Sequence, residues 1–319
     1  MDIHFSIKNR NKTMINLFSK LKSPILQSSD HYLHGKIVTE YEEKFADYVG
    51  AKYACSANSE TSLIFILFDK LVNDQDFIIP SILPPVVANS LINGGNTISF
   101  RDDVNWVGKD YEIDDNVWDS AHRVDKNQYE EHPNSVMLFS NYPTKPVGGI
   151  DGGMIVSDDK YLIDYIRLMV YNGATNQNNS WKRKQLGIGW KMYMSTIQAE
   201  VALYSLNNLE IKKERLGKIR EKYNNSFTLL NTSDHLYRVK VTDNKQVLEK
   251  LKGKGIVCGI HYQPLHTISL FNSFRTDIGK NFPLSDIAGK TMLSIPFHED
   301  LSDSDVEQII NEVSPYVIQ

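Results

Sequence analysis

Short apolar runs separated by helix-length segments are the feature of this sequence that most restricts its fold. The runs, rich in β-branched and aromatic residues, lie at residues 53–56, 76–79, 96–100, 117–119, 135–139 and 154–157. Segments long enough for helices separate several of them, at residues 61–71, 85–93 and 158–171. Strands that are apolar on both faces and alternate with helices are typical of an α/β domain. We therefore predict a mostly parallel central sheet covered by helices.

The remaining pattern predicts one helix before this sheet and a second, smaller unit after it. Helices are predicted at residues 38–49, 194–230 (one long or two joined), 244–252 and 304–316, and strands at 236–241 and 255–258. The closing helix begins with a capping box, Ser304 with Glu307 three residues later. We predict a large domain over residues 1–206 and a small C-terminal α/β domain over residues 207–319.

Charge and apolar run length exclude several classes of partner. The chain has 319 residues with 35 Lys and Arg against 39 Asp and Glu, a net charge of −4, so no overall basic field attracts nucleic acid or a membrane surface. No apolar run approaches the roughly 20 residues needed to cross a bilayer. Residues 1–19 lack the apolar core of a secretory signal, so we expect a cytoplasmic protein.

The two cysteines, Cys55 and Cys258, are too few for a disulfide framework or a zinc cage. Their apolar neighbours predict buried strand positions for both. We therefore expect no metal site.

Polar residues that follow the predicted strands are ambiguous when each is taken alone. A single lysine such as Lys145 is most often exposed, Asp119 could form a turn, and Thr61 could cap a helix. His261 and His266 could be two loop histidines that bind no ligand. The order in which these residues occur along the chain is more informative than any one of them.

That order resembles one known family. The chain offers a strand, residues 58–62 and a helix, then a strand and residues 119–122, then a strand and residues 140–145, and then residues 152–156. The series resembles the DegT/DnrJ/EryC1/StrS sugar aminotransferases, pyridoxal-phosphate enzymes of the aspartate aminotransferase fold (fold type I). The resemblance extends from about residue 33 to 313, through residues 40–50, 77–81, 194–199, 259–266 and 293–298.

The resemblance implies roles for three residues close to the cofactor ring. Lys145 would hold pyridoxal phosphate covalently and move a proton between the substrate carbon and the cofactor. Asp119 would pair with the pyridine nitrogen and keep it protonated, because a cationic ring withdraws electrons best. His122 would lie close to the ring.

The resemblance also implies how the phosphate is held. Thr61 and Ser62 would contact it at a helix N-terminus, where amide groups and the helix dipole favour an anion, and Ser140 would reach it from another loop. A further polar side chain comes in this family from the neighbouring subunit, and Lys191 takes that position here. We therefore expect a homodimer with shared active sites.

The implied reaction moves an amino group from an amino acid, with L-glutamate the expected donor, to a keto group of a nucleotide-linked sugar. Such reactions serve cell-surface polysaccharide or glycan synthesis, including that of O-antigen. The residues expected to contact the substrate are Trp181, Lys182, Arg183, His261, Tyr262 and His266. The basic run at 181–183 could instead be a solvated loop.

The sequence departs from the family pattern at three places that affect the expected site. Residues 101–118 are too few for the strand, helix and strand that this family carries there, so we expect a sheet one strand–helix unit shorter. Glu60 stands where a glycine is usual, and its carboxylate would repel the phosphate unless it turned outward. Leu83 or Pro84 lies near the position of an aromatic residue that stacks on the cofactor ring.

Two alternatives follow from these departures. The chain could be a non-catalytic homologue that binds or regulates. It could also be a pyridoxal-phosphate-dependent sugar dehydratase, a branch that replaces the lysine with histidine, although Lys145 argues against that.

Overall fold

The computed structural model describes residues 35–71, 75–175 and 180–318. Most predicted elements of the first half are present. In chain order they are α2 (Lys36–Val49), β1 (Tyr53–Ala57), α3 (Glu60–Leu71), β2 (Asp76–Pro80), α4 (Pro85–Asn93), β3 (Thr97–Arg101), β4 (Tyr111–Asp114), β5 (Val117–Asp119), β6 (Val136–Ser140), β7 (Gly153–Ser157) and α5 (Lys160–Val170). Residues 1–19, which carry the expectation about a secretory signal, lie outside the described residues.

The central sheet is mixed, which corrects the expectation of a mostly parallel one. Its five strands have the order β1-β7-β6-β5-β4, and β5–β6 is the parallel pair, whereas the three other pairings are antiparallel. β2 and β3 form a separate parallel pair. The physical reason lies in the connections: a tight turn joins β4 to β5 and a helix-free loop joins β6 to β7, whereas parallel neighbours need a long crossover.

The short segment between β3 and β5 holds one strand and, within the described residues, no helix. Its strand, β4, folds back on β5 as a hairpin in which Tyr111 lies opposite Asp119. Trp106, Val107 and Ile113 from this segment join the hydrophobic core. The segment therefore fills part of the space beside the sheet with side chains and a hairpin strand.

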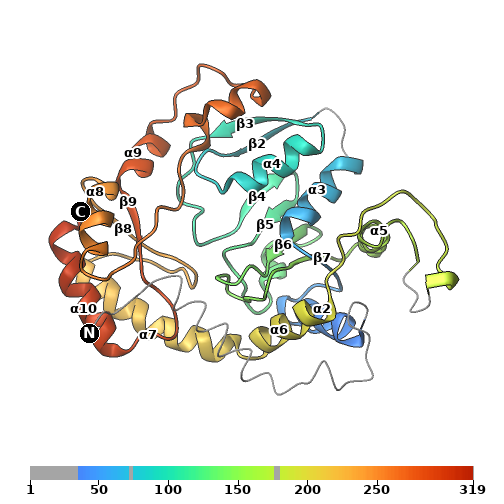
Figure 1. The fold of residues 1–319 in the computed structure, drawn as a ribbon, viewed down its shortest axis with the longest axis horizontal. Helices are drawn as coiled ribbons and strands as arrows, with labels where there is room; N and C mark the ends of the chain where they lie inside the picture. The colour runs from blue at the N-terminus through green and yellow to red at the C-terminus, as the bar shows by residue number, and fades with distance from the viewer. Residues whose placement is uncertain (1–34, 72–74, 176–179, 319) are drawn as a thin grey trace.

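Two apolar clusters cover the two faces of the sheet. Leu138 and Ile155 belong to the cluster under α3, α4 and α5, whereas their neighbours Phe139 and Met154 belong to the cluster under α2 and α6 (Thr196–Asn207). Successive strand residues point to opposite faces, so this alternation assigns each helix to its side. Figure 1 shows α2 and α6 lying side by side along one edge of the molecule.

The C-terminal part forms a third cluster on its own small sheet. Its elements are α7 (Leu209–Phe227), β8 (Tyr237–Lys240), α8 (Asn244–Lys252), α9 (Pro283–Thr291), β9 (Met292–Ile295) and α10 (Asp303–Val313). β8 and β9 pair antiparallel, and α7, α8 and α10 bury apolar side chains with them. The helical stretch from residue 194 is thus two helices that meet at Asn208. The domain boundary after residue 206 stays a prediction.

Two smaller expectations about this part are wrong. Residues 255–258 form no strand, because the segment bonds to β9 through a single bridge, Gly259 with Ser294. Cys258 is therefore outside any strand, whereas Cys55 is buried in β1 as predicted. None of the described helices has both the length and the apolar character to span a membrane.

The capping box of α10 lies two residues before the predicted one. Ser302 accepts from the amide of Asp305, whose side chain reaches back to the Ser302 amide. The sequence holds two overlapping matches to the capping pattern, and the earlier one forms the cap. The helix ends at Val313, and residues Ser314–Tyr316 form a 3₁₀ turn.

A buried ion pair joins α2, β1 and α5. Glu42, 4% exposed, accepts from the Ser56 amide (2.8 Å) and hydroxyl (2.7 Å) through Oε1. Its Oε2 accepts from Arg167 Nη1 at 2.6 Å, and Arg167 Nη2 donates to the Ala54 carbonyl at 2.6 Å. Removal of Glu42 would take one hydrogen bond each from the Ser56 amide, the Ser56 hydroxyl and Arg167 Nη1.

Removal of this carboxylate should therefore destabilise the fold. We expect Glu42→Ala to lower the free energy of unfolding by about 2–4 kcal/mol, because it leaves the half-buried Arg167 guanidinium without its carboxylate and the buried Ser56 donors without an acceptor. The neighbouring Glu43, which is exposed, provides the control, and Glu43→Ala should change stability by less than about 0.5 kcal/mol. Urea denaturation followed by circular dichroism measures both, and equal effects of the two substitutions would contradict this role of Glu42.

Candidate active site

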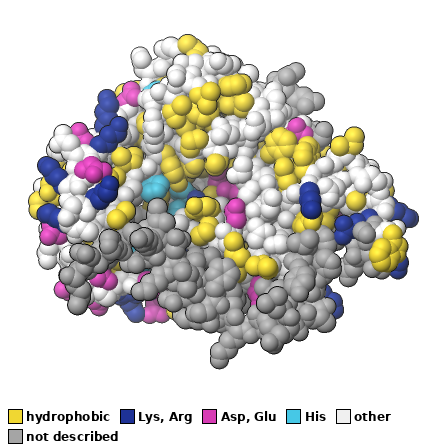
Figure 2. Space-filling model, in the orientation of Figure 1, with side chains coloured by type: hydrophobic (Ala, Val, Ile, Leu, Met, Phe, Trp, Pro, Cys, Tyr) yellow, Lys and Arg dark blue, Asp and Glu magenta, His cyan; other side chains and the backbone are white. Residues whose placement is uncertain are grey.

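Many of the predicted site residues meet at one cavity of about 430 Å³. Side chains from both parts of the chain line it, including Ser59, Glu60, Thr61, Pro84, Trp106, Asp119, His122, Ser140, Lys145, His261 and Tyr262. Figure 2 shows histidine and acidic side chains beside one another near the middle of this face. Lys145, Asp119, His122, Thr61, Ser140, His261 and Tyr262 are the residues among them that the sequence singled out for a site.

Strand direction explains why these residues meet. β5 and β6 are parallel, so Asp119 and Ser140, which end these strands, lie at the same edge of the sheet. β1 is antiparallel to β7, which is antiparallel to β6, so β1 also ends at this edge and delivers the start of α3 there. The carboxyl edge of such a sheet is where ligands bind in open α/β folds.

Asp119 is held on both of its oxygens. Its Oδ2 accepts from the Tyr111 hydroxyl at 2.6 Å and its Oδ1 from the Ala121 amide at 2.8 Å, and the residue is 4% exposed. Burial raises the pKa of Asp119, whereas the hydrogen bonds from Tyr111 and Ala121 and the charge of Lys145 oppose that shift. These contacts fix the carboxylate in one orientation. Sequence reasoning missed Tyr111, whose position is set by the unpredicted β4–β5 hairpin.

Lys145 is half-buried in the loop between β6 and β7. Burial lowers the pKa of its amine, and the carboxyl groups of Glu60 and Asp119 oppose that shift. Lys145 Nζ thus faces two carboxyl groups in a site that favours the neutral amine more than water does. A lysine with these properties is suited to act as a nucleophile and as a base.

The loop that carries Lys145 is anchored from two sides. The side-chain amide of Asn141 donates to the Val147 carbonyl at 3.0 Å, and the backbone carbonyl of Asn141 accepts from the Gly149 amide. Lys212 of α7 donates to the carbonyls of Lys145 (3.2 Å) and Pro146 (3.1 Å). The loop is therefore tied to the helix that leads into the C-terminal part.

His122 is buried beside Lys145 and is neutral. Its Nδ1 accepts from the Gly108 amide at 3.2 Å, so the ring proton is on Nε2, which lies 2.9 Å from the Tyr262 hydroxyl. Burial, with Lys145 adding to it, lowers the pKa of His122 well below its usual range. The hydrogen bond to Tyr262 links the large part of the chain to the C-terminal part across the cavity.

Trp106 forms a wall of the cavity that sequence reasoning missed. It is 4% exposed, and its indole N–H donates to the Ile82 carbonyl at 2.9 Å. The centroid of its ring lies 4.6 Å from that of the Tyr111 ring and 5.1 Å from that of the His122 ring. The length of segment 101–118 predicted a shorter sheet, but no periodicity within the segment indicated which of its side chains would point into the cavity.

Glu60 turns into the cavity rather than away from it. Its carboxyl group lines the same cavity as that of Asp119, and its Oε1 is buried without a hydrogen-bond partner among the described residues. Burial raises the pKa of Glu60 well above its usual range, and the nearby Asp119 raises it further, whereas Lys145 opposes the shift. The site thus contains a second carboxyl group that favours the protonated form.

The start of α3 presents Ser59 and Thr61 to the cavity, whereas Ser62 lies behind them. The Ser62 hydroxyl donates to Asn58 Oδ1 at 2.7 Å and lies 2.9 Å from the Ser59 hydroxyl. Ser59 Oγ also accepts from the Ser62 amide at 3.1 Å and so caps the helix. Ser59 was missed because the capping position and the helix start were assigned one or two residues too late.

The other predicted contacts lie outside the cavity wall. His266 is hydrogen-bonded to Ser81 (2.6 Å) and Asp286 (3.0 Å). Trp181 is 80% exposed, and Lys182, Arg183 and Lys191 lie on the same stretch of chain beyond the cavity. Their roles stay predictions.

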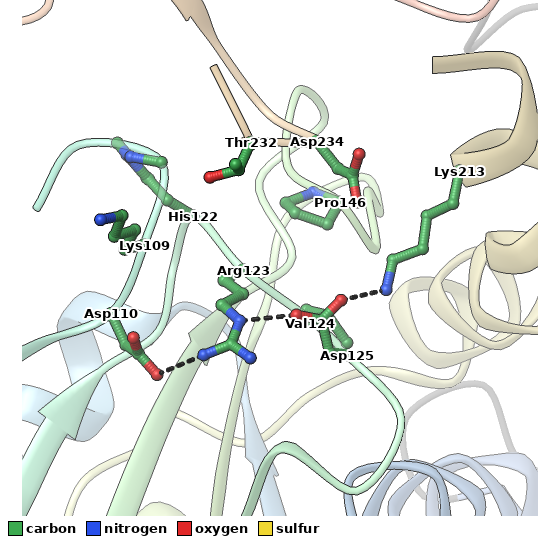
Figure 3. Close-up of a pocket in the computed structure, with 11 residues that line it drawn as sticks. Lys109, Asp110, His122, Arg123, Val124, Asp125, Pro146, Lys213, Thr232 and Asp234 are labelled. Carbon is green, nitrogen blue, oxygen red and sulfur yellow. Dashed lines mark hydrogen bonds and ion pairs between the residues drawn. The ribbon is translucent and has the colours of Figure 1, made fainter. Parts of the chain in front are cut away.

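A second cavity of about 320 Å³ adjoins the first and shares His122 with it. Figure 3 shows Arg123 at its floor between Asp110 (3.4 Å) and Asp125 (2.5 Å), with Lys213 of α7 also paired to Asp125. These charges neutralise one another and connect the β4–β5 region to α7. We therefore interpret this cavity as a charged interface within the chain.

Comparison with known proteins gives one family. The model of the DegT/DnrJ/EryC1/StrS aminotransferase family matches residues 19–105 and 119–314. The unmatched stretch between them contains Trp106 and Tyr111.

Named relatives span nearly the whole chain. UDP-4-amino-4,6-dideoxy-N-acetyl-beta-L-altrosamine transaminase of Campylobacter jejuni is 23% identical and covers 95% of this chain and 94% of its own length. Spore coat polysaccharide biosynthesis protein SpsC of Bacillus subtilis is 26% identical, with 89% and 90% covered.

Solved structures with the same fold cover the chain equally well. A DegT DnrJ EryC1 StrS aminotransferase from Brucella abortus has a TM-score of 0.77 at 20% identity, covering 99% of this chain and 98% of its own. Helicobacter pylori PseC, an aminotransferase of pseudoaminic acid biosynthesis, has a TM-score of 0.76 at 18% identity, with 95% of each chain covered. The PLP-form of Spr1654 from Streptococcus pneumoniae, a putative sugar aminotransferase by its name, has a TM-score of 0.78 at 17% identity, with 95% of each covered.

The packing of Trp106 makes a testable contribution to stability. We expect Trp106→Ala to lower the free energy of unfolding by about 3–5 kcal/mol, because it leaves a void between the Tyr111 and His122 rings. Trp181→Ala, which removes an indole that is 80% exposed, is the matched control and should change stability by less than about 0.5 kcal/mol. Urea denaturation of both variants measures the difference, and similar losses would show that Trp106 is not a packing residue.

Proposed function

Because the chain belongs to the DegT/DnrJ/EryC1/StrS aminotransferase family, we propose that it uses pyridoxal phosphate to transfer an amino group from an amino acid to a keto group of a nucleotide-linked sugar. The observation that carries this proposal is the meeting of Lys145 and Asp119 in one cavity at the carboxyl edge of the sheet. L-Glutamate is the proposed donor.

The residues at the cavity wall fit this cofactor at most of the points where it needs a partner. Lys145 supplies an amine for covalent attachment, and Asp119 an oriented carboxylate for the pyridine nitrogen. Thr61 and Ser59 at the start of α3, together with Ser140, supply hydroxyl groups for the phosphate. Glu60 is the exception, because its unpartnered carboxyl oxygen lies in the same cavity.

When bound, pyridoxal phosphate supplies an electron-withdrawing ring that stabilises the charge left when the substrate carbon loses a proton. Lys145 would attach the cofactor and then carry that proton on Nζ, for which its lowered pKa suits it. Asp119 would hold the proton of the pyridine nitrogen in place, with Tyr111 and Ala121 keeping it ionised and oriented. His122, neutral and bonded to Tyr262, would bound the ring side of the cavity without adding charge.

The names of the relatives support the substrate class. One is named as a transaminase of a UDP-linked amino sugar and another as a protein of spore coat polysaccharide biosynthesis. We extend this to synthesis of a cell-surface polysaccharide or glycan, such as O-antigen, in the cytoplasm. His261 and Tyr262 line the cavity from the C-terminal part and would contact the sugar, with His266 behind them. The run Trp181, Lys182 and Arg183, of which the first two are exposed, would contact the nucleotide diphosphate.

A homodimer is part of the proposal. Leu186 and Ile188 are 65% and 86% exposed on the stretch that carries Lys191, which is unusual for apolar side chains unless a partner covers them. In a two-fold pair this stretch would bring Lys191 of each copy to the cofactor phosphate of the other.

A non-catalytic role is the second candidate, and Glu60 is the observation that favours it. A carboxyl group inside the cavity weakens the binding of an anion such as the cofactor phosphate. A protein that did not bind the cofactor would not use the Lys145 amine for catalysis. The dehydratase alternative is disfavoured because the position at which that branch carries histidine is Lys145 in this chain.

Colour and turnover distinguish these candidates. We expect the purified chain with pyridoxal phosphate to absorb visible light, and borohydride to fix the cofactor on Lys145, as peptide mass spectrometry would detect. Lys145→Ala should lower the rate of transamination of a keto UDP-sugar by L-glutamate about 1000-fold or more, because it removes the proton-transferring amine. Lys126→Ala at an exposed position is the control. A colourless chain that never takes up the cofactor would favour the non-catalytic candidate.

Shared sites predict complementation between two inactive variants. Lys145→Ala and Lys191→Ala should each abolish turnover alone, whereas a refolded equimolar mixture should recover about one quarter of the wild-type activity. Half of the random dimers are mixed, and each mixed dimer has one intact site because its two wild-type lysines come from different chains. No recovery in a mixture that forms mixed dimers would contradict the assignment of Lys191 to the neighbouring site.

A further inference from the structure

On the basis of the proposed function, we infer that Glu60 couples cofactor binding to a proton: the anionic cofactor binds tightly only when the Glu60 carboxyl group is protonated. The family pattern carries a glycine at this position, so the coupling belongs to this chain's own sequence. It follows from where the carboxyl group lies, what surrounds it and which charges remain when the cavity is filled.

The backbone fixes Glu60 at the cavity. It is the first residue of α3, directly after the capping Ser59. Gly153 at the start of β7 packs against it so closely that a Cβ on Gly153 would lie 2.3 Å from the Glu60 amide nitrogen. The helix start therefore cannot shift toward β7, and the side chain leaves the backbone at the cavity edge, where Oε1 is buried and unpartnered among the described residues.

Charged and titratable groups face Glu60 from each neighbouring element. They are Asp119 from β5, Tyr111 from β4, Lys145 from the loop after β6 and Tyr262 from the C-terminal part, with His122, Tyr142, Asp151, His235 and His261 also at the cavity wall. Two carboxyl groups that line one cavity and repel each other cannot both ionise at low cost, so we infer that Glu60 and Asp119 share one proton. Because Tyr111 and Ala121 both donate to Asp119, the charge lies on Asp119 and the proton on Glu60.

Cofactor binding makes the proton on Glu60 more necessary. Lys145 is the only Lys or Arg among the described residues that line the cavity, and in the proposed function its amine is used to attach the cofactor. The added phosphate brings further negative charge. No other lysine or arginine in the described lining of the cavity would then offset an ionised Glu60 beside the added phosphate, so the bound state favours the protonated acid. Binding takes up a proton once the pH exceeds the pKa of Glu60 in the free protein.

The test is the pH dependence of cofactor affinity rather than of turnover. Equilibrium dialysis of pyridoxal phosphate against the full-length chain between pH 6 and pH 9 gives the dissociation constant for wild type, Glu60→Gln and the exposed control Glu221→Gln. We expect affinity in wild type and Glu221→Gln to fall with rising pH more steeply than in Glu60→Gln, by up to about tenfold per pH unit. Thermal unfolding of each cofactor-free variant checks that it folds.

The outcomes separate this inference from the function beneath it. Equal pH slopes in wild type and Glu60→Gln would overturn the coupling even if both bind the cofactor and transaminate. A Glu60→Gln variant that binds more weakly at every pH with an unchanged slope would do the same, since it would show a purely structural role. If no variant binds pyridoxal phosphate at any pH, the proposed function fails and the coupling fails with it.

Discussion

The site depends on the Lys145 amine and the Asp119 carboxylate lining one cavity, where their charges interact. Neither charge is stable alone out of water, and each shifts the pKa of the other toward the charged form. The sheet makes this possible because β5 and β6 are parallel and end at one edge. Hydrogen bonds from Tyr111 and Ala121 fix the acid, and the Lys212 contacts fix the loop of the base.

The shortened segment before β5 is compensated locally rather than left as a gap. Its hairpin strand β4 pairs with β5 and brings the Tyr111 hydroxyl to Asp119, while Trp106 closes the cavity wall against His122. The family match skips the stretch that contains both residues. Support for the acid therefore comes from a part of the chain that the family model does not match.

Sequence patterns predicted most of the strands, though not β4 or β9, because apolar runs are local signals. The family resemblance, rather than these patterns, implied that Asp119 and Lys145 belong to one site. The patterns could not predict strand direction, since a doubly buried run reads the same in parallel and antiparallel sheets. Tyr111 and Trp106 were missed because their roles arise from a hairpin register, and Ser302 was missed because two capping patterns overlap. The inward turn of Glu60 depended on packing against Gly153, a contact distant in sequence.

Because Glu60 is the first residue of α3, its ionised carboxylate and a bound phosphate would compete for the N-terminus of this helix. The free amides and dipole of a helix N-terminus favour a negative charge, and both an ionised Glu60 and a bound phosphate would use them. Burial and the nearby Asp119 carboxylate raise the pKa of Glu60 and so favour its protonated form. A protonated Glu60 leaves the helix start available to the phosphate, whereas an ionised one occupies it. The same helix end can therefore serve as an anion site or as the counter-charge of its own first residue, and the proton on Glu60 decides which.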